Sequence, residues 1–374
     1  MTVPDESSRL FKKISGALTG GALGDAMGQV TEMMQYPTIE RVHGWIDTLK
    51  DTGSAARFSP NVPAGTYTDD TRLKHLFCDA IIRKGGRITA DDLAETWLEQ
   101  MKGWYYTPVL NSYFKLAVDH VRPRNAGRGN MSSNSTAMAI APIGILNACD
   151  PRQAAQDAYE VACLVHETYA LDAAAAIAAA VAEAFSPEAS VDSILQASTA
   201  YIDRDSEMRD LINGALVLAR KAGDYRRFRE EFYGSMLWER PQGLGAEELA
   251  PEGYYDIAEP RETVPACLAM VYLSGGHARD AIIYSANFGR DADTMGSIVG
   301  GIVGAHEGID GLPEDWVRLV NEVNAVSQQD LARRMFRCVT SEINRMRERG
   351  RLVAALESPA QTNPAIESQR TSHS

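Results

Sequence analysis

The sequence contains few of the features that support disulfide bonds or β-structure. Its 374 residues include five cysteines, which are widely spaced and odd in number. We therefore expect free thiols in a reducing cytoplasm rather than a disulfide framework. No two of them stand at the spacing of a metal-binding pair. Alternating runs of β-branched and aromatic residues are also scarce, which disfavours a large β-sheet.

Long apolar segments and an excess of basic residues are missing too. The most apolar stretch, Ala173–Ala184, is short and carries Asp172 and Glu183 at its ends, so it does not resemble a transmembrane span. Residues 1–10 lack the basic and apolar regions of a signal peptide. With 37 Lys and Arg against 50 Asp and Glu, the net charge is −13, which argues against binding to a nucleic-acid backbone. We expect a soluble cytoplasmic protein with neither membrane nor direct nucleic-acid partners.

Helix-forming patterns, in contrast, fill most of the chain. Hydrophobic residues make up 45% of it and recur mainly at helical spacing. Glycines stand every four residues from Gly16 to Gly28 and again from Gly296 to Gly304. Because a glycine inside a helix costs about 1 kcal/mol relative to alanine, these stripes indicate helices that press against another backbone or a ligand. We predict an all-α fold.

Two carboxylate clusters lie far apart in the sequence, each at the start of an apolar helical pattern. They are Thr68-Asp69-Asp70-Thr71 and Asp291-Ala292-Asp293-Thr294. Thr and Asp before a helix also serve as ordinary N-caps, but four aspartates exceed what two caps need. Carboxylates at close range force protons onto one another, whereas Mg²⁺ takes oxygen ligands and keeps bound water that can become a nucleophile. If the clusters meet, they predict a metal-dependent hydrolase.

Three further features have both a functional and an ordinary structural interpretation. The Gly-, Asn- and Ser-rich segment 125–135 either cradles a phosphate with backbone amides or is a surface loop. His166 lies between apolar helical segments, where a core histidine is commoner than a catalyst. Arg290 either binds an anionic group through its guanidinium fork or balances the neighbouring aspartates. The early glycine stripe lacks the preceding strand and the Gly-Lys-Ser/Thr of a P-loop.

Several short motifs occur in a fixed order along the chain. They are Gly24-Asp25-Ala26-Met27-Gly28 with Glu32, Thr68-Asp69-Asp70-Thr71, Pro142-Ile143-Gly144, His166, Glu262-Thr263-Val264-Pro265, Asn287-Phe288-Gly289-Arg290-Asp291-Ala292-Asp293-Thr294, and Pro313 with Trp316. Each motif is weak alone, but their order over roughly residues 11–345 resembles that of the ADP-ribosylglycohydrolase family.

The resemblance implies a single orthogonal helical bundle as a catalytic domain over residues 11–350. Residues 1–10 would be an N-terminal extension, 238–255 an irregular insertion, and the polar tail 351–374 disordered. The resemblance also implies two Mg²⁺ ions, with Mn²⁺ as a substitute. The implied ligands are Thr68, Asp69, Asp70, Asp291, Asp293 and Thr294. The implied substrate contacts are Asn134, Ser135, Thr136, His166, Asn287, Gly289 and Arg290. Glu32, Asp69 or Asp293 would take the proton of the attacking water, and the sequence leaves that choice open.

The resulting expectation is hydrolysis of an N- or O-glycosidic bond at the anomeric carbon of an ADP-ribosyl or other ribosyl group. Arg290 departs from the family's usual Gly-Gly-Asp, Ala139 replaces a frequent Arg, and Arg72 and Lys74 add charge behind the first cluster. These departures leave open a small ribosylated nucleoside- or nucleotide-type metabolite in place of an ADP-ribosylated protein. A catalytically silent structural or regulatory protein is a further alternative, which the intact carboxylates argue against. The sequence does not indicate an oligomeric state.

Overall fold

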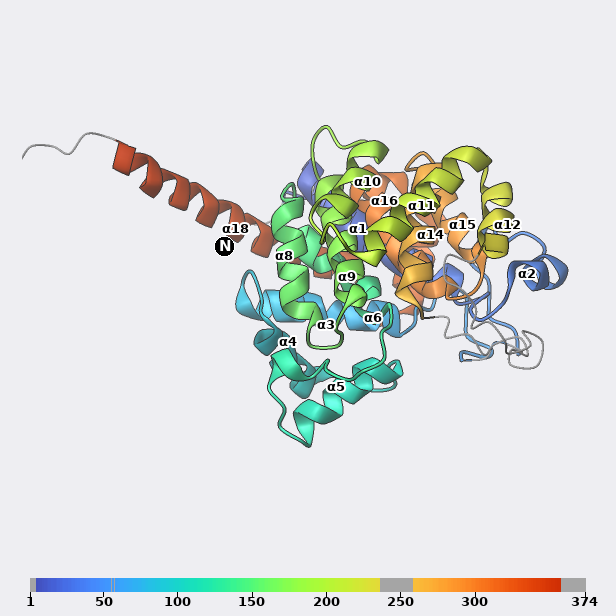
Figure 1. Ribbon diagram of the computed structural model, residues 1–374, viewed down its shortest axis with the longest axis horizontal. Helices are drawn as coiled ribbons and strands as arrows, with labels where there is room; N and C mark the ends of the chain where they lie inside the picture. Colours follow the sequence, from blue (N-terminus) through green and yellow to red (C-terminus); the bar gives the residue numbers. More distant parts are fainter. Residues whose placement is uncertain (1–4, 55, 57, 236–257, 358–374) are drawn as a thin grey trace, which may run out of the picture.

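The computed structural model describes residues 5–54, 56, 58–235 and 258–357. Within these ranges the chain forms helices and no strand, apart from one isolated bridge between Gln35 and Gly289, which confirms the all-α prediction (Figure 1). No helix in the described part is long and apolar enough to cross a membrane. The elements are α1 (Arg9–Gly28), α2 (Tyr36–Val42), α3 (Asp69–Lys84), α4 (Ala90–Gln100), α5 (Thr107–Ala117), the 3₁₀ helix η1 (Pro123–Asn125), α6 (Ser135–Ala139), α7 (Ala141–Leu146), α8 (Pro151–Ala162), α9 (Tyr169–Ala184), α10 (Val191–Ala200), α11 (Glu207–Ala222), α12 (Tyr225–Ser235), α14 (Pro260–Leu273), α15 (Ala278–Phe288), α16 (Ala292–Glu307), the 3₁₀ helix η2 (Ile309–Gly311), α17 (Glu314–Val323) and α18 (Gln328–Glu357).

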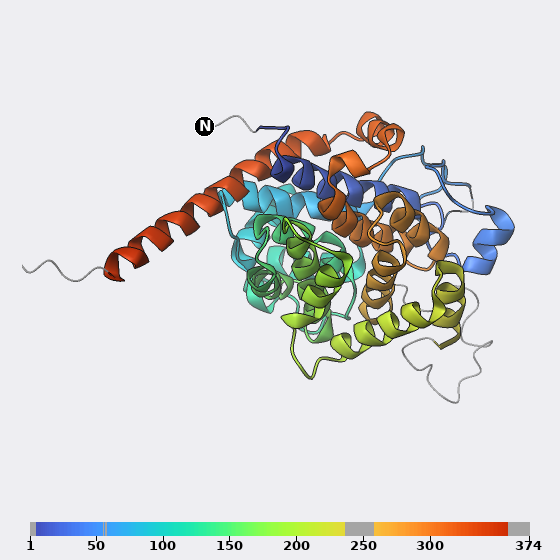
Figure 2. The ribbon, with the colours of Figure 1, turned by 90° about the horizontal axis from the view of Figure 1, so that it is seen from above.

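The two glycine-striped helices, α1 and α16, pack against each other at the centre of the molecule (Figures 1 and 2). A Cβ atom added to Gly16 would lie 2.2 Å from the carbonyl oxygen of Gly304, and one added to Gly20 would lie 2.3 Å from that of Gly300. Early residues of α1 therefore face late residues of α16, so the helices are antiparallel. The stripes mark a backbone-to-backbone contact, as the glycine spacing predicts.

The alanine-rich helix α9 forms the other part of the core. Its residues from Ala173 to Ala182 are all buried, because small side chains let several helices approach it closely. The ammonium group of Lys13 lies where α9 and α16 end, and donates to the carbonyl oxygens of Ala184 (2.6 Å), Ala305 (2.8 Å) and His306 (2.8 Å). A cation that binds the carbonyl ends of two helices is stabilising there. Burial nevertheless lowers the pKa of Lys13 to about 8.

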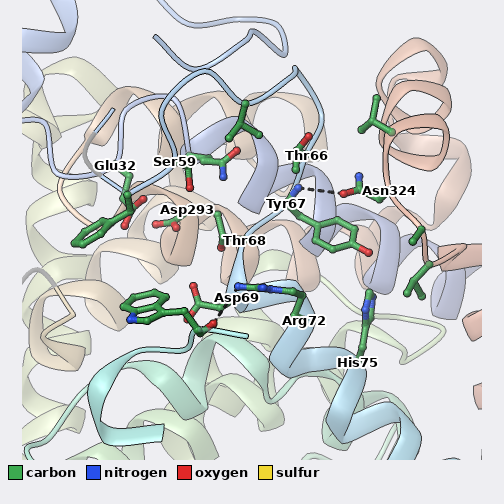
Figure 3. A pocket seen from close by; sticks show the side chains of 17 residues that line it. Glu32, Ser59, Thr66, Tyr67, Thr68, Asp69, Arg72, His75, Asp293 and Asn324 are labelled. Atoms are coloured by element: carbon green, nitrogen blue, oxygen red, sulfur yellow. Dashed lines mark hydrogen bonds between the residues drawn. The ribbon is translucent and has the colours of Figure 1, made fainter. Parts of the chain in front are cut away.

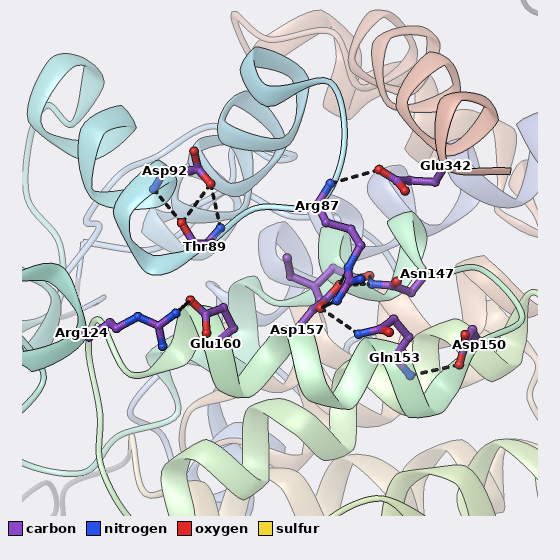
Figure 4. Close-up of polar contacts among 11 residues, drawn as sticks. Arg87, Thr89, Asp92, Arg124, Asn147, Asp150, Gln153, Asp157, Glu160 and Glu342 are labelled. Atoms are coloured by element: carbon purple, nitrogen blue, oxygen red, sulfur yellow. Dashed lines mark hydrogen bonds and ion pairs between the residues drawn. The ribbon is translucent and has the colours of Figure 1, made fainter. Parts of the chain in front are cut away.

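A polar network ties the turn between α3 and α4 to α7 and α8 (Figure 4). The carboxylate of Asp157 on α8 accepts from the guanidinium of Arg87 through two nitrogens. It also accepts from the amides of Asn147 at 2.9 Å and Gln153 at 3.0 Å. Every oxygen of this buried carboxylate is thus occupied, which makes the network a structural support and not a free binding group.

The two ends of the predicted catalytic domain are helical. α1 begins at Arg9, inside the segment predicted as an extension, and Ser8 caps it. α18 continues to Glu357 and projects from the body of the molecule (Figures 1 and 2). Residues 351–357, which we placed in the disordered tail, are therefore helical. Residues 358–374 and the predicted insertion at 238–255 lie outside the described residues.

Candidate metal centre and active site

The first carboxylate cluster lies at the N-terminus of α3, as predicted. Thr68 is the N-cap, and Asp69 and Asp70 are in the first turn, where the helix dipole favours negative charge. The fully buried Asp25 of α1 holds this terminus: its carboxylate accepts from the backbone N–H groups of Thr68 and Thr71 at 3.0 Å each, and from the Thr71 hydroxyl at 2.5 Å. Asp25 thereby fixes the direction of the two aspartates that follow Thr68.

The second cluster lies at the N-terminus of α16, with Asp291 as the N-cap and Asp293 in the first turn. The side-chain amide of Asn134, the residue that caps α6, donates to Asp291 Oδ2 at 2.5 Å and to Thr263 Oγ1 of α14 at 2.9 Å. The Asp293 carboxylate accepts from the backbone N–H of Thr294 at 3.0 Å. Asn134 therefore links the predicted phosphate loop to a predicted metal ligand.

The two clusters meet around one space, together with Glu32. One carboxylate oxygen each from Glu32, Asp291 and Asp293 lies within 4.8 Å of the other two. Figure 3 shows Glu32 and Asp293 on one side of this space, with Thr68 and Asp69 of the first cluster beside them. The juxtaposition depends on the α1–α16 contact, because Asp25 of α1 anchors the first cluster and α16 carries the second.

Burial and mutual repulsion raise the pKa values of these carboxyls. Burial raises the pKa values of Asp70, Asp291 and Asp293 well above their ordinary range, and each gains a further increase from a neighbouring carboxylate. The pKa of Glu32 is raised in the same way, first by burial and then by Asp293. Burial also raises the pKa of Asp69 to about 6. This is the electrostatic signature of a site that lacks a compensating positive charge.

The residues fit a hard divalent cation. Their donors are carboxylate and hydroxyl oxygens, which Mg²⁺ and Mn²⁺ prefer. Among the described residues, the buried Oδ1 atom of Asp70 has no hydrogen-bond partner, although Asp70 Oδ2 accepts from the Thr68 hydroxyl at 3.1 Å. An unpaired buried carboxylate oxygen is costly, and a cation in this space would satisfy it.

A backbone contact between two loops holds Glu32 over the second cluster. The N–H of Met33 donates to the Arg290 carbonyl at 2.7 Å, and the N–H of Arg290 donates to the Met34 carbonyl at 2.6 Å. Gly289 makes this contact possible: its φ is +79°, and a Cβ there would lie 2.3 Å from the Met34 oxygen. The position of Gly289 is thus explained by the contact between the loops.

Two residues predicted as substrate contacts have protein partners outside the carboxylate cluster. The buried guanidinium of Arg290 donates from Nε to Glu262 Oε1 at 2.8 Å and from its terminal nitrogen to Oε2 at 3.0 Å. The fully buried amide of Asn287 accepts from the N–H of Ile46 at 2.9 Å and donates to the Ile46 carbonyl at 2.6 Å. Both side chains are thus held by protein partners, and their contact with a substrate stays a prediction.

Ser135, Thr136 and His166 lie together in a buried polar row beside the N-terminus of α6. The hydroxyl of Ser133 lies 2.7 Å from Ser135 Oγ and 3.3 Å from His166 Nε2. Burial lowers the pKa of His166 to about 3, so the imidazole is neutral near pH 7. The Thr136 hydroxyl is buried and finds no hydrogen-bond partner in the part of the chain that the structure describes.

An open pocket of about 740 Å³ lies beside the carboxylates (Figure 3). Its volume is in the range of small-molecule sites. Glu32, Asp69 and Asp293 form its acidic end. The other walls are formed by Gln29, Phe58, Ser59, Val62, Thr66, Tyr67, Thr68, Arg72, His75, Trp104 and Val323–Val326.

Asp25 is the functional residue that the sequence analysis missed. It belongs to the early glycine motif, but we assigned it no role, because a single aspartate inside a helix does not reveal which distant backbone it will contact. Phe58 and Trp104, which line the pocket, were also not singled out, because they lie in separate loops that only the folded chain brings together.

Comparisons with known proteins agree with this arrangement. Residues 6–346 match the sequence model of a glycohydrolase family, described as ADP-ribosylglycohydrolase. An uncharacterized protein of Escherichia coli, YegU, is 27% identical over 86% of this chain and 95% of its own length. Human ADP-ribosylhydrolase ARH3 is 23% identical over 83% of this chain and 89% of its own.

A bacterial enzyme and a solved structure extend the comparison. ADP-ribosylarginine hydrolase Tri1 of Pseudomonas putida is 26% identical over 87% of this chain and 78% of its own length. A solved structure described as an ADP-ribosylglycohydrolase-related protein complex superposes with a TM-score of 0.65 and 21% identity over 88% of this chain and 99% of its own. The ordered motifs, the helical fold and a family match over nearly the whole chain lead to one conclusion: this protein belongs to the ADP-ribosylglycohydrolase family.

Proposed function

We propose that the protein hydrolyses the N- or O-glycosidic bond at the anomeric carbon of an ADP-ribosyl group. The observation that carries this proposal is the meeting of Glu32 with the two aspartate clusters at one pocket. ARH3 and Tri1 are named as hydrolases of ADP-ribosyl compounds, which supports the same class of substrate here. A small ribosylated nucleoside- or nucleotide-type metabolite is the second candidate, since Arg72 gives the pocket a cationic wall that the family's usual motif does not supply.

Six residues would hold the metal: Thr68, Asp69, Asp70, Asp291, Asp293 and Thr294. When bound, Mg²⁺ or its substitute Mn²⁺ would supply Lewis-acid charge and lower the pKa of water. The unpaired Oδ1 atom of Asp70 and the raised pKa values support two such ions in this acidic space.

The chain's own residues would orient water and substrate. The carboxylate of Asp69, which lines the pocket, accepts from the backbone N–H of Tyr106 at 3.2 Å. Asp69, Asp293 or Glu32 would take the proton of the attacking water. We propose Asn134, Ser135, Thr136 and His166 as the diphosphate-ribose side of the site, because Asn134 joins this row to Asp291.

The proposal is tested by release of free ADP-ribose from a panel of ADP-ribosylated peptides and small ribosylated compounds. Metal content is measured by elemental analysis on the same preparations. Asp70→Ala and Asp293→Ala should each lose metal and lower the rate by about 10³-fold or more, because residues that act as one unit are not additive. Asp91 is an exposed aspartate in the first turn of α4, so Asp91→Ala is the matched control. This variant should keep the metal content and the rate of the wild type.

Each alternative has its own outcome in this experiment. Full metal content with a wild-type rate in either variant would overturn the shared metal site. Release from small compounds alone would favour the metabolite hydrolase. Metal binding without release from any compound would identify a catalytically silent member. We also propose a cytoplasmic location, which the five unpaired cysteines support.

A further inference from the structure

The open pocket and the polar row are separate parts of the site. None of the described residues that line it belongs to the group Asn134, Ser135, Thr136 and His166. If the ribosyl group is held by the aspartates and the row, as proposed above, its anomeric carbon lies at the acidic end of this pocket. The group that leaves the anomeric carbon must then occupy the pocket itself. The residues that line the pocket therefore indicate the chemical class of the leaving group.

An aromatic pair forms one wall. The rings of Phe58 and Trp104 lie 5.9 Å apart between centroids and are inclined by only 20°. Both side chains are about half exposed, at 50% and 51%. A large aromatic side chain such as Trp104, half exposed in the wall of a pocket, is suited to stacking against another flat ring.

A cation is fixed to the same wall. The guanidinium of Arg72 donates to the backbone carbonyl of Trp104 at 3.1 Å and lies over the Tyr105 ring, with its central carbon 5.4 Å from the centroid. Its Nε atom is buried and has no hydrogen-bond partner among the residues that the structure describes. A guanidinium with an unused donor pairs best with a planar acceptor such as a carbonyl or carboxylate. Figure 3 shows Arg72 beside Asp69, which places this donor near the acidic end.

We propose that this pocket is the leaving-group subsite of the proposed hydrolase and takes a planar aromatic group that carries a carbonyl or carboxylate. Trp104 stacks on its ring, and Arg72 binds its oxygen. In the reaction, a bond forms between the water oxygen and the anomeric carbon while the bond to the leaving group breaks. The leaving group departs with the bonding electron pair, and the proton of the water passes to a site carboxylate. The role of the pocket as a leaving-group site rests on the proposed function. Binding of a planar aromatic ligand to the pocket can be measured without any hydrolysis.

The binding test uses benzoate, benzamide and cyclohexanecarboxylate as probes on the full chain with Mg²⁺, followed by ligand-observed NMR. Benzoate and cyclohexanecarboxylate carry the same charge, but only benzoate has a flat ring. Benzoate and benzamide have the same flat ring, but only benzoate is charged. We expect benzoate to bind about fivefold more tightly than cyclohexanecarboxylate, since stacking favours the flat ring. Trp104→Leu should abolish this preference, and Arg72→Gln should abolish the preference for benzoate over benzamide.

Matched controls stand elsewhere on the surface. Phe114→Leu removes an aromatic ring that is 55% exposed on α5, and Arg347→Gln removes an exposed cation on α18. Both should keep the wild-type preferences. Melting temperature and metal content are measured on every variant, so that a loss of fold is separated from a loss of binding. Wild-type preferences in Trp104→Leu and Arg72→Gln, or no benzoate binding by the wild type, would overturn the subsite.

A kinetic test separates the subsite from the proposed function. ADP-ribosyl compounds with aromatic and aliphatic leaving groups are compared by their kcat/KM values. The ratio in favour of the aromatic substrate should fall about fivefold in Trp104→Leu. An unchanged ratio would overturn the subsite while the hydrolase stands. If the wild type hydrolyses neither compound, the proposed function fails, and the benzoate preferences alone decide the chemistry of the pocket.

Discussion

Gly24 of α1 and Gly296 of α16 face each other with no room for a side chain on either. A Cβ on Gly24 would lie 1.9 Å from the Gly296 carbonyl oxygen, and a Cβ on Gly296 would lie 2.1 Å from that of Gly24. Asp25 follows directly and anchors the first aspartate cluster, whereas α16 begins with the second. The closest approach of the two backbones therefore sets the distance between the two halves of the proposed metal site.

Substitution at this contact should be destabilising. We expect Gly24→Ala to lower the free energy of unfolding by about 1–3 kcal/mol or more, because both backbones must move apart. Urea denaturation measures the loss, and Mg²⁺ titration should show weaker binding. Gly350→Ala is the control: its Cβ would meet nothing within 4 Å on the projecting part of α18, so stability should hold or rise by up to about 1 kcal/mol. A Gly24→Ala protein as stable as the wild type would contradict the contact.

The Arg290–Glu262 ion pair should behave as a buried unit. Glu262→Gln and Arg290→Gly each leave the other charge buried without a full partner, for which we expect a cost of about 3–5 kcal/mol. The double variant should recover part of that loss in a double-mutant cycle. Glycine also suits the φ of +62° at position 290. Strictly additive losses would show that the two side chains do not act together.

His166 should serve substrate binding without holding metal. Mg²⁺ prefers oxygen ligands, and the imidazole contacts the Ser133 hydroxyl, which leads to Ser135. We expect His166→Ala to raise KM while two metals per chain remain bound. Ser133→Ala, which keeps the imidazole but breaks the row, should shift KM in the same direction. A lower melting temperature with unchanged kinetics in the folded fraction would identify His166 as a core histidine.

Buried neutral histidines should contribute less stability in acid. Burial lowers the pKa of His75 to about 4 and that of His166 to about 3, whereas a histidine in an unfolded chain titrates near 6.5. Between about pH 6.5 and 4 these two side chains thus bind more protons in the unfolded state, so their contribution to the unfolding free energy falls as the pH falls, opposite in sign to that of the site carboxyls with raised pKa values. His75→Phe should therefore make the slope of the unfolding free energy against pH less positive by up to about 1.4 kcal/mol per pH unit.

Denaturation curves at about pH 4.5, 5.5 and 6.5 measure the slope in the wild type and in His75→Phe. The exposed His120 has a φ of +52°, which asparagine tolerates, so His120→Asn is a suitable control and should keep the wild-type slope. Equal slopes in all three proteins would mean that His75 is not held neutral in the folded state.

The fold class and the glycine contact were predictable because both follow from local sequence spacing. Apolar residues recur at helical intervals, and the glycines recur every four residues. Residues 191–235 form α10, α11 and α12, although the sequence there gave no clear pattern. Contacts between distant residues were not predictable. From the sequence, Arg72 and Lys74 were both interpreted as positive charge behind the first cluster. In the structure Arg72 lines the pocket, whereas Lys74 is fully buried and donates to Ser297 Oγ at 2.8 Å. We expected Arg290 to meet a substrate anion or a ligand aspartate, and the structure pairs it with Glu262, a partner that no local spacing reveals.

The antiparallel pairing of α1 with α16 has a consequence for the newly made chain. Asp70 leaves the ribosome long before Asp291, by roughly 10–40 s at ordinary rates of translation. During that interval the glycine face of α1 cannot pack against α16. The first aspartate cluster likewise lacks the second cluster with which it would bind a cation. Closing so long a loop carries an entropic cost that only the finished chain can offset. Tight metal uptake would therefore report that synthesis has passed α16, and a chain that stops short of it should bind none.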